Sequence, residues 1–419
     1  MNHFSSQIIP LLFTTKQQFV EAARRGDVQT VRSCLKMYNT KDKIFHDAFW
    51  FACRELKPKV AELLLEHGAD PNTRYSPFVG YCVLHRVISA ALGTAEEERQ
   101  SGQKLLNLLI LHGADPNAGV DWNGRSPFLL ALSLIPYNLS PEASSDYFDV
   151  IKLLLAHGAD LNAKDTKGRT ALFEVLGKGW HWIDFLLGQG ANIKLRDSHG
   201  FTLLHRLVFS NPFQKQVVQN LIDRGMALDA TNDKGETALC FLFKSCFSIN
   251  LEAAKFLLKA GAKVDFPDSV RGRTALHHAA FRRHHEGLVC LLQHGANVNT
   301  QDFCGNTALH LVTENAYRCC GHIPFDSSFS ILDCLLSHGA NPCSRNVQGE
   351  TPLELACHTS DCVDRLCQST SPEIRRMTGI PLSSLDFIFR LLQATVQEDR
   401  DWVALLRDGP KKWMHTASS

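Results

Sequence analysis

Short aliphatic runs, each followed by a turn that contains a glycine, recur along most of the chain. Each run, such as residues 150–155, predicts the buried stripe of a short helix, and the glycine ends that helix by entering the left-handed conformation. The turn glycines are 45, 45, 32, 35, 36, 34 and 44 residues apart: Gly68, Gly113, Gly158, Gly190, Gly225, Gly261, Gly295 and Gly339. A period in the thirties, lengthened three times by about ten residues, predicts stacked repeats rather than a compact enzyme domain.

A second helix is predicted in each repeat, after a polar turn such as "DTKG" at 165–168 or "NDKG" at 232–235. After each turn stands a residue whose hydroxyl can cap a helix: Ser126, Thr170, Thr202, Thr237, Thr274, Thr307 and Thr351. Pro127 and Pro352 follow their caps at the first helical position, where the missing N–H costs nothing. Near the N-terminus, Asp47 takes the cap position. The unit is therefore a turn, a helix, a short link and a second helix.

This unit resembles the ankyrin repeat. Residues 272–299, "GRTALHHAAFRRHHEGLVCLLQHGANVN", follow the family's T-P-L-H-x-A and H-G-A-D/N segments nearly position for position. The resemblance extends over residues 17–370, or about ten repeats, and is weakest at the two ends, where a repeat lacks one neighbour. It implies an all-α ankyrin-repeat solenoid with short hairpin fingers, preceded by an N-terminal segment at 1–16.

Three repeats contain extra residues, near 91–103, 135–146 and 316–329. The extra residues fall between the two helices of a repeat, so we expect loops that project from the rim opposite the fingers. Insertions into repeats often bind partners. The alternative is a surface excursion that binds nothing.

The repeat pattern stops after residue 370. Leu385, Ile388, Phe389 and Leu392 are spaced as on one face of a helix, and a second apolar group follows at 402–406. Residues 371–419 therefore predict a C-terminal helical cap on the last repeat, followed by a polar tail. Residues 380–392 also faintly resemble the opening of an F-box-like segment, although the acidic positions and the spacing depart from that pattern. This second resemblance implies an alternative function, a substrate-recognition adaptor of a ubiquitin ligase that docks through this segment.

The composition fits a protein that acts on other proteins. The 44 basic and 43 acidic side chains nearly cancel, so no net field favours nucleic acid. No segment is long and apolar enough to span a membrane, and no signal peptide is recognised. The 14 cysteines are placed mostly in helical segments, as expected of free thiols in a reducing compartment. We expect a monomer in the cytoplasm; the nucleus, or a host cytosol for a delivered bacterial protein, remain open.

The clustered cysteines and histidines do not predict a metal site or an active site. Cys357, His358, Cys362 and Cys367 lack the paired spacing of zinc ligands, and we expect neither a metal nor a cofactor. Many histidines belong to the repeat itself, and for one set the resemblance implies a structural hydrogen bond: His85, His205, His277 and His310. Because no nucleophile elbow, phosphate loop or H-E-x-x-H motif is present, we do not expect an enzyme.

The resemblance implies a scaffold that binds a partner protein through a concave surface made of the fingers and the first helices. Several fingers carry aromatic residues, which commonly anchor protein interfaces: Tyr75, Phe78, Trp122, Phe266 and Phe303. The alternative is that each ring packs on a neighbouring finger. Arg282 and Arg283, just after the first helix of the best-matching repeat, are candidate polar contacts.

Four asparagines follow a helix-ending glycine by four residues: Asn72, Asn117, Asn162 and Asn299. This position resembles the site that asparaginyl hydroxylase modifies in ankyrin repeats. The resemblance therefore predicts hydroxylation at one or more of them.

Overall fold

The computed structural model describes residues 16–355 except 39, 41, 75–79, 138, 141–143, 211, 246–248, 319–325 and 353–354. The chain divides into two compact units, at residues 1–199 and 200–419, and each is described by itself. The expected N-terminal segment, the C-terminal cap and the F-box-like segment lie outside the described residues. The predicted end of the array at residue 370 therefore stays a prediction.

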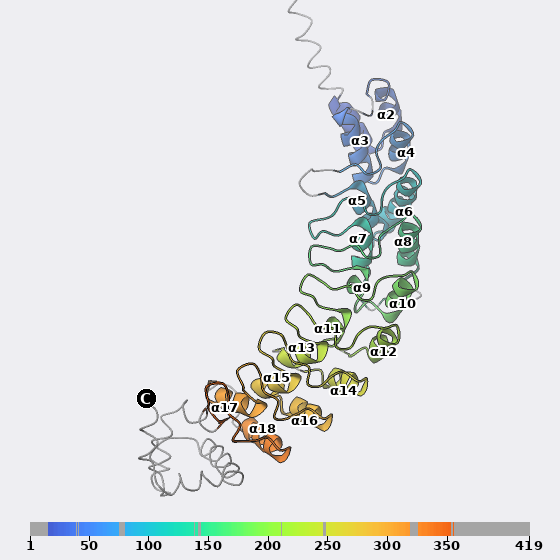
Figure 1. Cartoon of the computed structure of the whole chain (residues 1–419). Helices are drawn as coiled ribbons and strands as arrows, with labels where there is room; N and C mark the ends of the chain where they lie inside the picture. Colours follow the sequence, from blue (N-terminus) through green and yellow to red (C-terminus); the bar gives the residue numbers. More distant parts are fainter. Residues whose placement is uncertain are drawn as a thin grey trace, which may run out of the picture. The chain divides into compact units, whose positions relative to one another are not determined.

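The first unit is built from helix pairs in two layers (Figure 1). After a helix at residues 16–25, its helices are α2 (Val28–Cys34), α3 (Lys43–Arg54), α4 (Pro58–Glu66), α5 (Val83–Ala91), α6 (Glu96–Leu111), α7 (Pro127–Ser133), α8 (Ser145–Ala156), α9 (Ala171–Glu174) and α10 (Trp180–Gly188). Within a pair, α5 packs on α6 and α7 on α8. Between pairs, α3, α5, α7 and α9 form one layer, while α2, α4 and α6 form the other.

The second unit repeats the same arrangement. Its described helices are α11 (Leu203–Leu207), α12 (Lys215–Asp223), α13 (Ala238–Lys244), α14 (Leu251–Lys259), α15 (Ala275–Arg282), α16 (His285–Gln293), α17 (Ala308–Arg318) and α18 (Asp326–Ser337). The helices α11, α13, α15 and α17 stack in sequence, and so do α14, α16 and α18. No strand is formed by the described residues of either unit, where two isolated β-bridges occur. The predicted all-α repeat fold is confirmed.

Helix starts and ends follow the predicted signals. Helix α7 begins after Ser126, whose Oγ accepts the N–H of Leu129 at 3.3 Å, and α13 begins after Thr237. Every predicted helix-ending glycine has a φ between 81° and 95°. The prediction for Asp47 is wrong, because α3 begins at Lys43 and its cap is Asp42. The helix thus starts one turn earlier than its apolar pattern indicated.

The insertion at 91–103 is not a loop, which corrects the expectation for this segment. Helix α6 begins at Glu96, so most of the extra residues lengthen the outer helix. Acidic residues in its first turn favour a helix N-terminus, and Arg99 donates to Asp146 at 2.8 Å. A Cβ on Gly102 would lie 2.4 Å from the amide nitrogen of Ala91, so glycine permits the close packing of α6 on α5.

In the second insertion, α7 ends at Ser133 and α8 begins at Ser145, and the described residues 135–137 and 139–140 lie outside both helices. Its Ile135 is buried. The third insertion falls partly outside the described residues, between α17 and α18.

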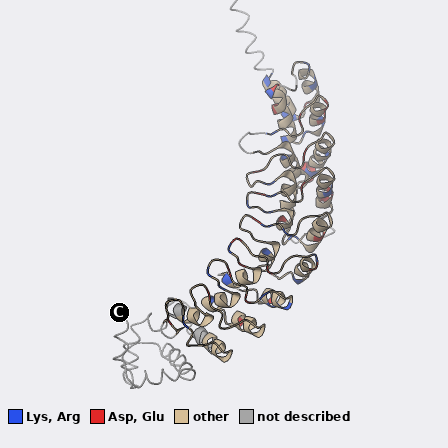
Figure 2. Cartoon of the chain, viewed as in Figure 1, with Lys and Arg blue, Asp and Glu red and all other residues tan. Residues whose placement is uncertain are grey.

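The core lies between the two helix layers and between successive repeats. Its largest fully buried side chains include Phe128, Trp182 and Phe243. Charged residues of both signs are interspersed along the layers of each unit (Figure 2). Among the helices of the described segments, none has the length and apolar character needed to cross a membrane.

Candidate protein-binding surface

From residue 121 onwards, each described finger is organised by one buried Asx side chain. The Oδ1 of Asp165 accepts the N–H groups of Lys167 and Arg169, both at 2.8 Å, while its Oδ2 pairs with the Arg169 guanidinium at 2.7 Å. Asp121 holds Arg125 in the same way. These bonds satisfy the carboxylate and fix the turn, so the residue directly after the Asx lies at the tip of the finger.

Successive fingers are joined by backbone hydrogen bonds at these tips. In the first unit, the Thr166 N–H donates to the Asn123 carbonyl at 2.9 Å. In the second unit, the Phe303 N–H donates to the Arg271 carbonyl at 2.8 Å, and the Val347 N–H donates to the Cys304 carbonyl at 2.9 Å. The tip residues of neighbouring fingers are therefore held at a fixed spacing, as a binding surface requires.

The histidines of the helix-start motif connect one repeat to the next, which confirms their expected structural role. His277 Nδ1 lies 3.2 Å from the backbone N–H of Thr274, which donates to it, and His277 Nε2 lies 3.0 Å from the Asn306 carbonyl. Burial lowers the pKa of His277 to about 4, more than the hydrogen bond to Asn306 raises it. His85, His205 and His310 make the same pair of contacts. At His277 the neutral ring is thus the form that joins the repeats.

Two of the predicted aromatic residues are prominent on the surface. Trp122 is 74% exposed and Phe303 is 66% exposed. The Trp122 ring stacks on Tyr81 at a centroid distance of 6.5 Å, and the Phe303 ring covers Gly272, where a Cβ would lie 2.5 Å from it. Each ring therefore packs on a neighbouring finger and still presents most of its area to solvent. Phe266 is half-buried, and Tyr75 and Phe78 lie outside the described residues.

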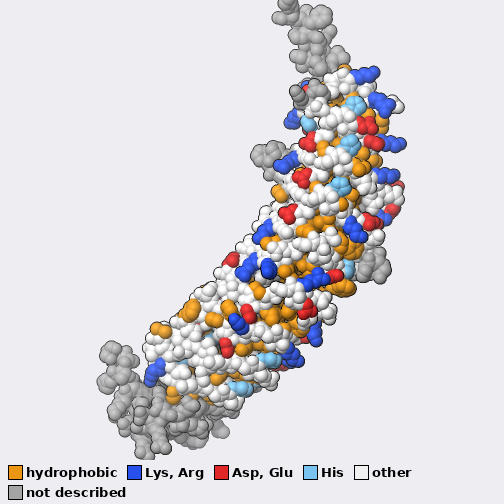
Figure 3. Space-filling model, turned by 45° about the vertical axis from the view of Figure 1, so that its right-hand side comes forward, with side chains coloured by type: hydrophobic (Ala, Val, Ile, Leu, Met, Phe, Trp, Pro, Cys, Tyr) orange, Lys and Arg blue, Asp and Glu red, His pale blue; other side chains and the backbone are white. Residues whose placement is uncertain are grey.

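The sequence reasoning missed two aliphatic residues near the finger tips. Val270 is 57% exposed and Val347 is 75% exposed, and they lie on the fingers before and after that of Phe303. We call Val270, Phe303 and Val347 the tip ridge. The signal was available, because Val347 directly follows a finger Asx, as Phe303 does. In the view of Figure 3, hydrophobic side chains are interspersed with charged ones.

Arg282 and Arg283 differ in the structure. Arg282 is exposed, with its guanidinium carbon 5.9 Å from the centre of the Phe281 ring. Arg283 is 9% exposed, so little of its side chain is open to a partner, and its role as a partner contact stays a prediction. Arg283 is the C-cap of α15 and adopts the left-handed conformation, with φ at 59°. The sequence did not reveal this turn because arginine is rarely found in that conformation.

The four asparagines proposed for hydroxylation link neighbouring repeats. Asn117 Oδ1 accepts the Asp160 N–H at 2.8 Å, and its Nδ2 donates to the Gly158 carbonyl at 2.8 Å. Asn299 makes the equivalent bonds to Asn341 and Gly339, while Asn72 and Asn162 each accept one N–H. Their modification stays a prediction.

A cavity of about 810 Å³ lies between the C-terminal ends of α11 and α13 and the links that follow them. Its walls combine the rings of Phe209, Phe213 and Phe241 with Ser245 and Asn250. Phe209 and Phe241 meet edge to face at 5.3 Å. The cavity can accept an apolar side chain and offers polar groups beside it.

The cysteines of the described segments that were expected in helices are mostly buried, including Cys34, Cys53 and Cys290. Cys357, Cys362 and Cys367 lie outside those segments. Away from the finger tips, the side chains of Cys240, Asp268 and His278 could together hold a metal ion.

Comparisons with known proteins agree with the fold. A family model described as ankyrin repeats (3 copies) matches residues 142–232, 210–302 and 242–323, and a single ankyrin repeat model matches residues 304–347. Together with the stacked helix pairs, these matches define a repeat protein of the ankyrin class. The chain belongs to the ankyrin repeat family.

Curated relatives match parts of the chain. It is 30% identical over 200 residues to "Protein glp-1" of Caenorhabditis elegans, covering 44% of this chain and 15% of the relative. It is 28% identical over 202 residues to mouse "Inversin", covering 44% of this chain and 19% of the relative. It is 33% identical over 132 residues to the mouse "B-cell lymphoma 3 protein homolog", covering 30% and 28%. The chain thus matches less than a third of the length of these relatives.

Proposed function

We propose that this chain is a non-enzymatic scaffold that binds a partner protein along a concave surface made of the fingers and the first helix of each repeat. Ankyrin repeats typically mediate protein–protein interactions, which gives the general class. The observation that supports the particular surface is the tip ridge, a row of apolar side chains at or next to the tips of adjacent fingers, each more than half exposed. Trp122 provides a similar exposed tip in the first unit.

The exposure of these side chains provides binding free energy to a partner that covers them. Apolar side chains at rigid, solvent-exposed positions lose water when a partner covers them, and a buried aromatic anchor contributes about 2 kcal/mol or more to an interface. The tip backbones are already fixed by hydrogen bonds between fingers, so little conformational entropy is lost on binding. The surface is therefore prepared to bind without refolding.

Truncation of the exposed tips tests this proposal. Trp122→Ala and Phe303→Ala should each be measured for thermal unfolding and for recovery of partners from lysate. Thr166→Ala is a matched control, because Thr166 occupies the same tip position on the finger after Trp122. We expect the aromatic variants to lose partners while remaining folded, and the control to retain them. Full partner recovery by both folded aromatic variants would refute the proposed surface.

The alternative of a ubiquitin-ligase adaptor rests on residues 380–392, outside the described part of the chain, and stays a prediction. The same holds for the expected monomer and the cytoplasmic location. Recovery of ligase subunits by the full chain, and their loss on deletion of residues 372–419, would favour the adaptor.

A further inference from the structure

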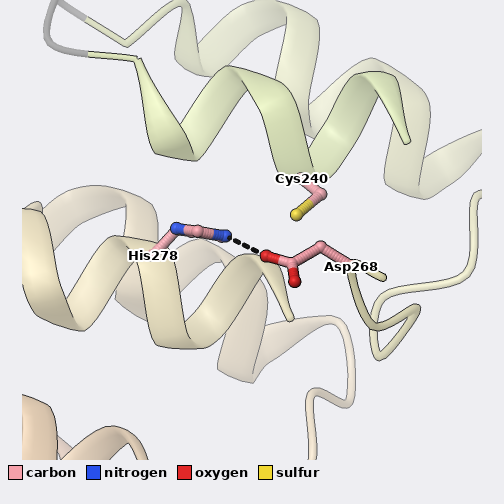
Figure 4. Close-up of side chains that lie close together, drawn as sticks. All are labelled: Cys240, Asp268 and His278. Carbon is pink, nitrogen blue, oxygen red and sulfur yellow. Dashed lines mark hydrogen bonds and ion pairs between the residues drawn. The ribbon is translucent and has the colours of Figure 1, made fainter. Parts of the chain in front are cut away.

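Cys240, Asp268 and His278 form a buried cluster between two neighbouring repeats. Cys240 comes from α13, whereas Asp268 and His278 come from the next finger and from α15 (Figure 4). One donor atom from each residue lies within 4.8 Å of the other two. His278 Nε2 and Asp268 Oδ2 are 3.1 Å apart. We propose that this cluster is a binding site for a divalent cation of the zinc type, which links the two repeats.

The donor set suits such an ion. Zinc is bound by thiolate sulfur, imidazole nitrogen and carboxylate oxygen at about 2.0–2.3 Å, which separates tetrahedral ligands by about 3.3–3.7 Å. The distance of 3.1 Å between His278 Nε2 and Asp268 Oδ2 is already close to this range, and the Cys240 sulfur needs a shift of at most about 1.5 Å. Three protein ligands are fewer than the four of most structural zinc sites, so a water molecule would complete the coordination.

The pairing of Asp268 differs from that of other finger carboxylates. The finger carboxylates of Asp121 and Asp165 each pair with an arginine four residues later. At the finger of Asp268, the corresponding Arg273 pairs instead with Asp302, at 3.2 Å. Within the described residues, Asp268 instead has His278 as a side-chain partner, with 3.1 Å between Oδ2 and Nε2.

The Cys240 thiol must lose its proton when it binds the ion, because the thiolate is the form that binds zinc. The thiolate and the Asp268 carboxylate would then supply two anionic ligands for the divalent charge.

Cys240 replaces a histidine that the neighbouring repeats have at the same position. Cys240 occupies the slot that holds His205 in the preceding repeat and His277 in the following one. Those histidines bond the next repeat at 2.9 and 3.0 Å, whereas the Cys240 sulfur lies 3.7 Å from the Arg273 carbonyl. An ion would restore a strong link at this junction.

The neighbouring junction lacks a complete donor set. There the same three slots hold His277, Asp302 and Leu311, so one of the ligands is replaced by an aliphatic side chain.

Cobalt titration of the full-length, reduced and chelator-treated chain tests the site. We expect Co²⁺ to give a thiolate charge-transfer absorption that Zn²⁺ abolishes by displacement. Cys240→Ser and His278→Gln should each weaken binding by about 100-fold or more, since each removes a direct ligand. Cys290→Ser is the matched control, because Cys290 is equally buried (2% exposed, against 1% for Cys240) and lies outside the cluster.

A second readout separates this site from the other thiols of the chain. Zn²⁺ should raise the midpoint of thermal unfolding of the wild type and of Cys290→Ser, because a ligand that binds the folded state stabilises it. Cys240→Ser should show no rise, while its circular dichroism without metal remains that of the wild type. Absence of cobalt absorption in the wild type, or an unchanged spectrum in Cys240→Ser, would overturn the proposal. If Cys240→Ser does not fold, the same comparison with His278→Gln decides.

Discussion

Two glycines in one repeat separate backbone strain from the contact between fingers. Gly235 stands in the finger before α13, and Gly261 ends α14, with φ values of +70° and +95°. A Cβ on Gly261 would meet no atom within 4 Å, but a Cβ on Gly235 would lie 2.5 Å from the Ser269 nitrogen. That nitrogen donates to the Lys234 carbonyl at 3.0 Å. Alanine at either position is strained, yet only alanine at Gly235 also pushes on the next finger.

The expected magnitudes follow from this difference. Gly261→Ala should cost about 1 kcal/mol, the price of a left-handed conformation with a Cβ. Gly235→Ala adds the displaced backbone and the weakened hydrogen bond between fingers, for a total of about 2–4 kcal/mol. Urea unfolding followed by circular dichroism measures both variants against the wild type. Equal losses of stability would show that the fingers do not support one another, and would contradict the rigid surface described above.

Three further predictions concern buried polar groups and the asparagines. Because burial lowers the pKa of His277 to about 4 from an ordinary 6.5, the unfolded state binds more protons between these values. Stability should then be complete above pH 6.5 and fall by about 3 kcal/mol towards pH 4, and His277→Gln should flatten this dependence in unfolding experiments at several pH values. Lys178 donates hydrogen bonds to the last carbonyls of α7, at Leu132 and Ser133. Lys178→Met should therefore lower the free energy of unfolding in urea by about 2 kcal/mol. An unchanged free energy of unfolding would mean that the desolvation of the ammonium group cancels these bonds. Peptide mass spectrometry of the chain from animal cells should find oxidised asparagine at one or more of Asn72, Asn117, Asn162 and Asn299, and unmodified peptides at all four would contradict the resemblance.

The repeat fold could be predicted because its determinants are local. Thr274 starts α15 and Gly295 follows α16, and both signals depend on a few neighbouring residues. The lengthened helix α6 was less predictable. The need for glycine at position 102 is clear only when Ala91 of α5 is known to lie against it. A glycine within a polar insertion otherwise indicates a loop.

The site was predicted in part. Trp122 and Phe303 stand out because large aromatic residues are unusual in finger turns, whereas Val270 and Val347 do not attract attention until their exposure is known. The burial of Arg283 depends on a left-handed turn without a glycine signal. In the metal-binding cluster, His278 lies 10 positions after Asp268 and Cys240 lies 28 positions before it. Only the stacking of two repeats brings the three residues together.

The proposed binding surface is tested most directly by hydrogen–deuterium exchange. The exchange is measured on the free chain and on its complex with a partner protein that was purified on the immobilised chain. We expect slower exchange in the complex at the fingers, especially at residues 268–272 and 302–305, which carry Val270 and Phe303 of the tip ridge. The backbone amides of α12, α14 and α16, the second helices of their repeats, should exchange at unchanged rates. Protection confined to those second helices, or to the segment beyond residue 355, with the fingers unaffected, would contradict the proposed surface.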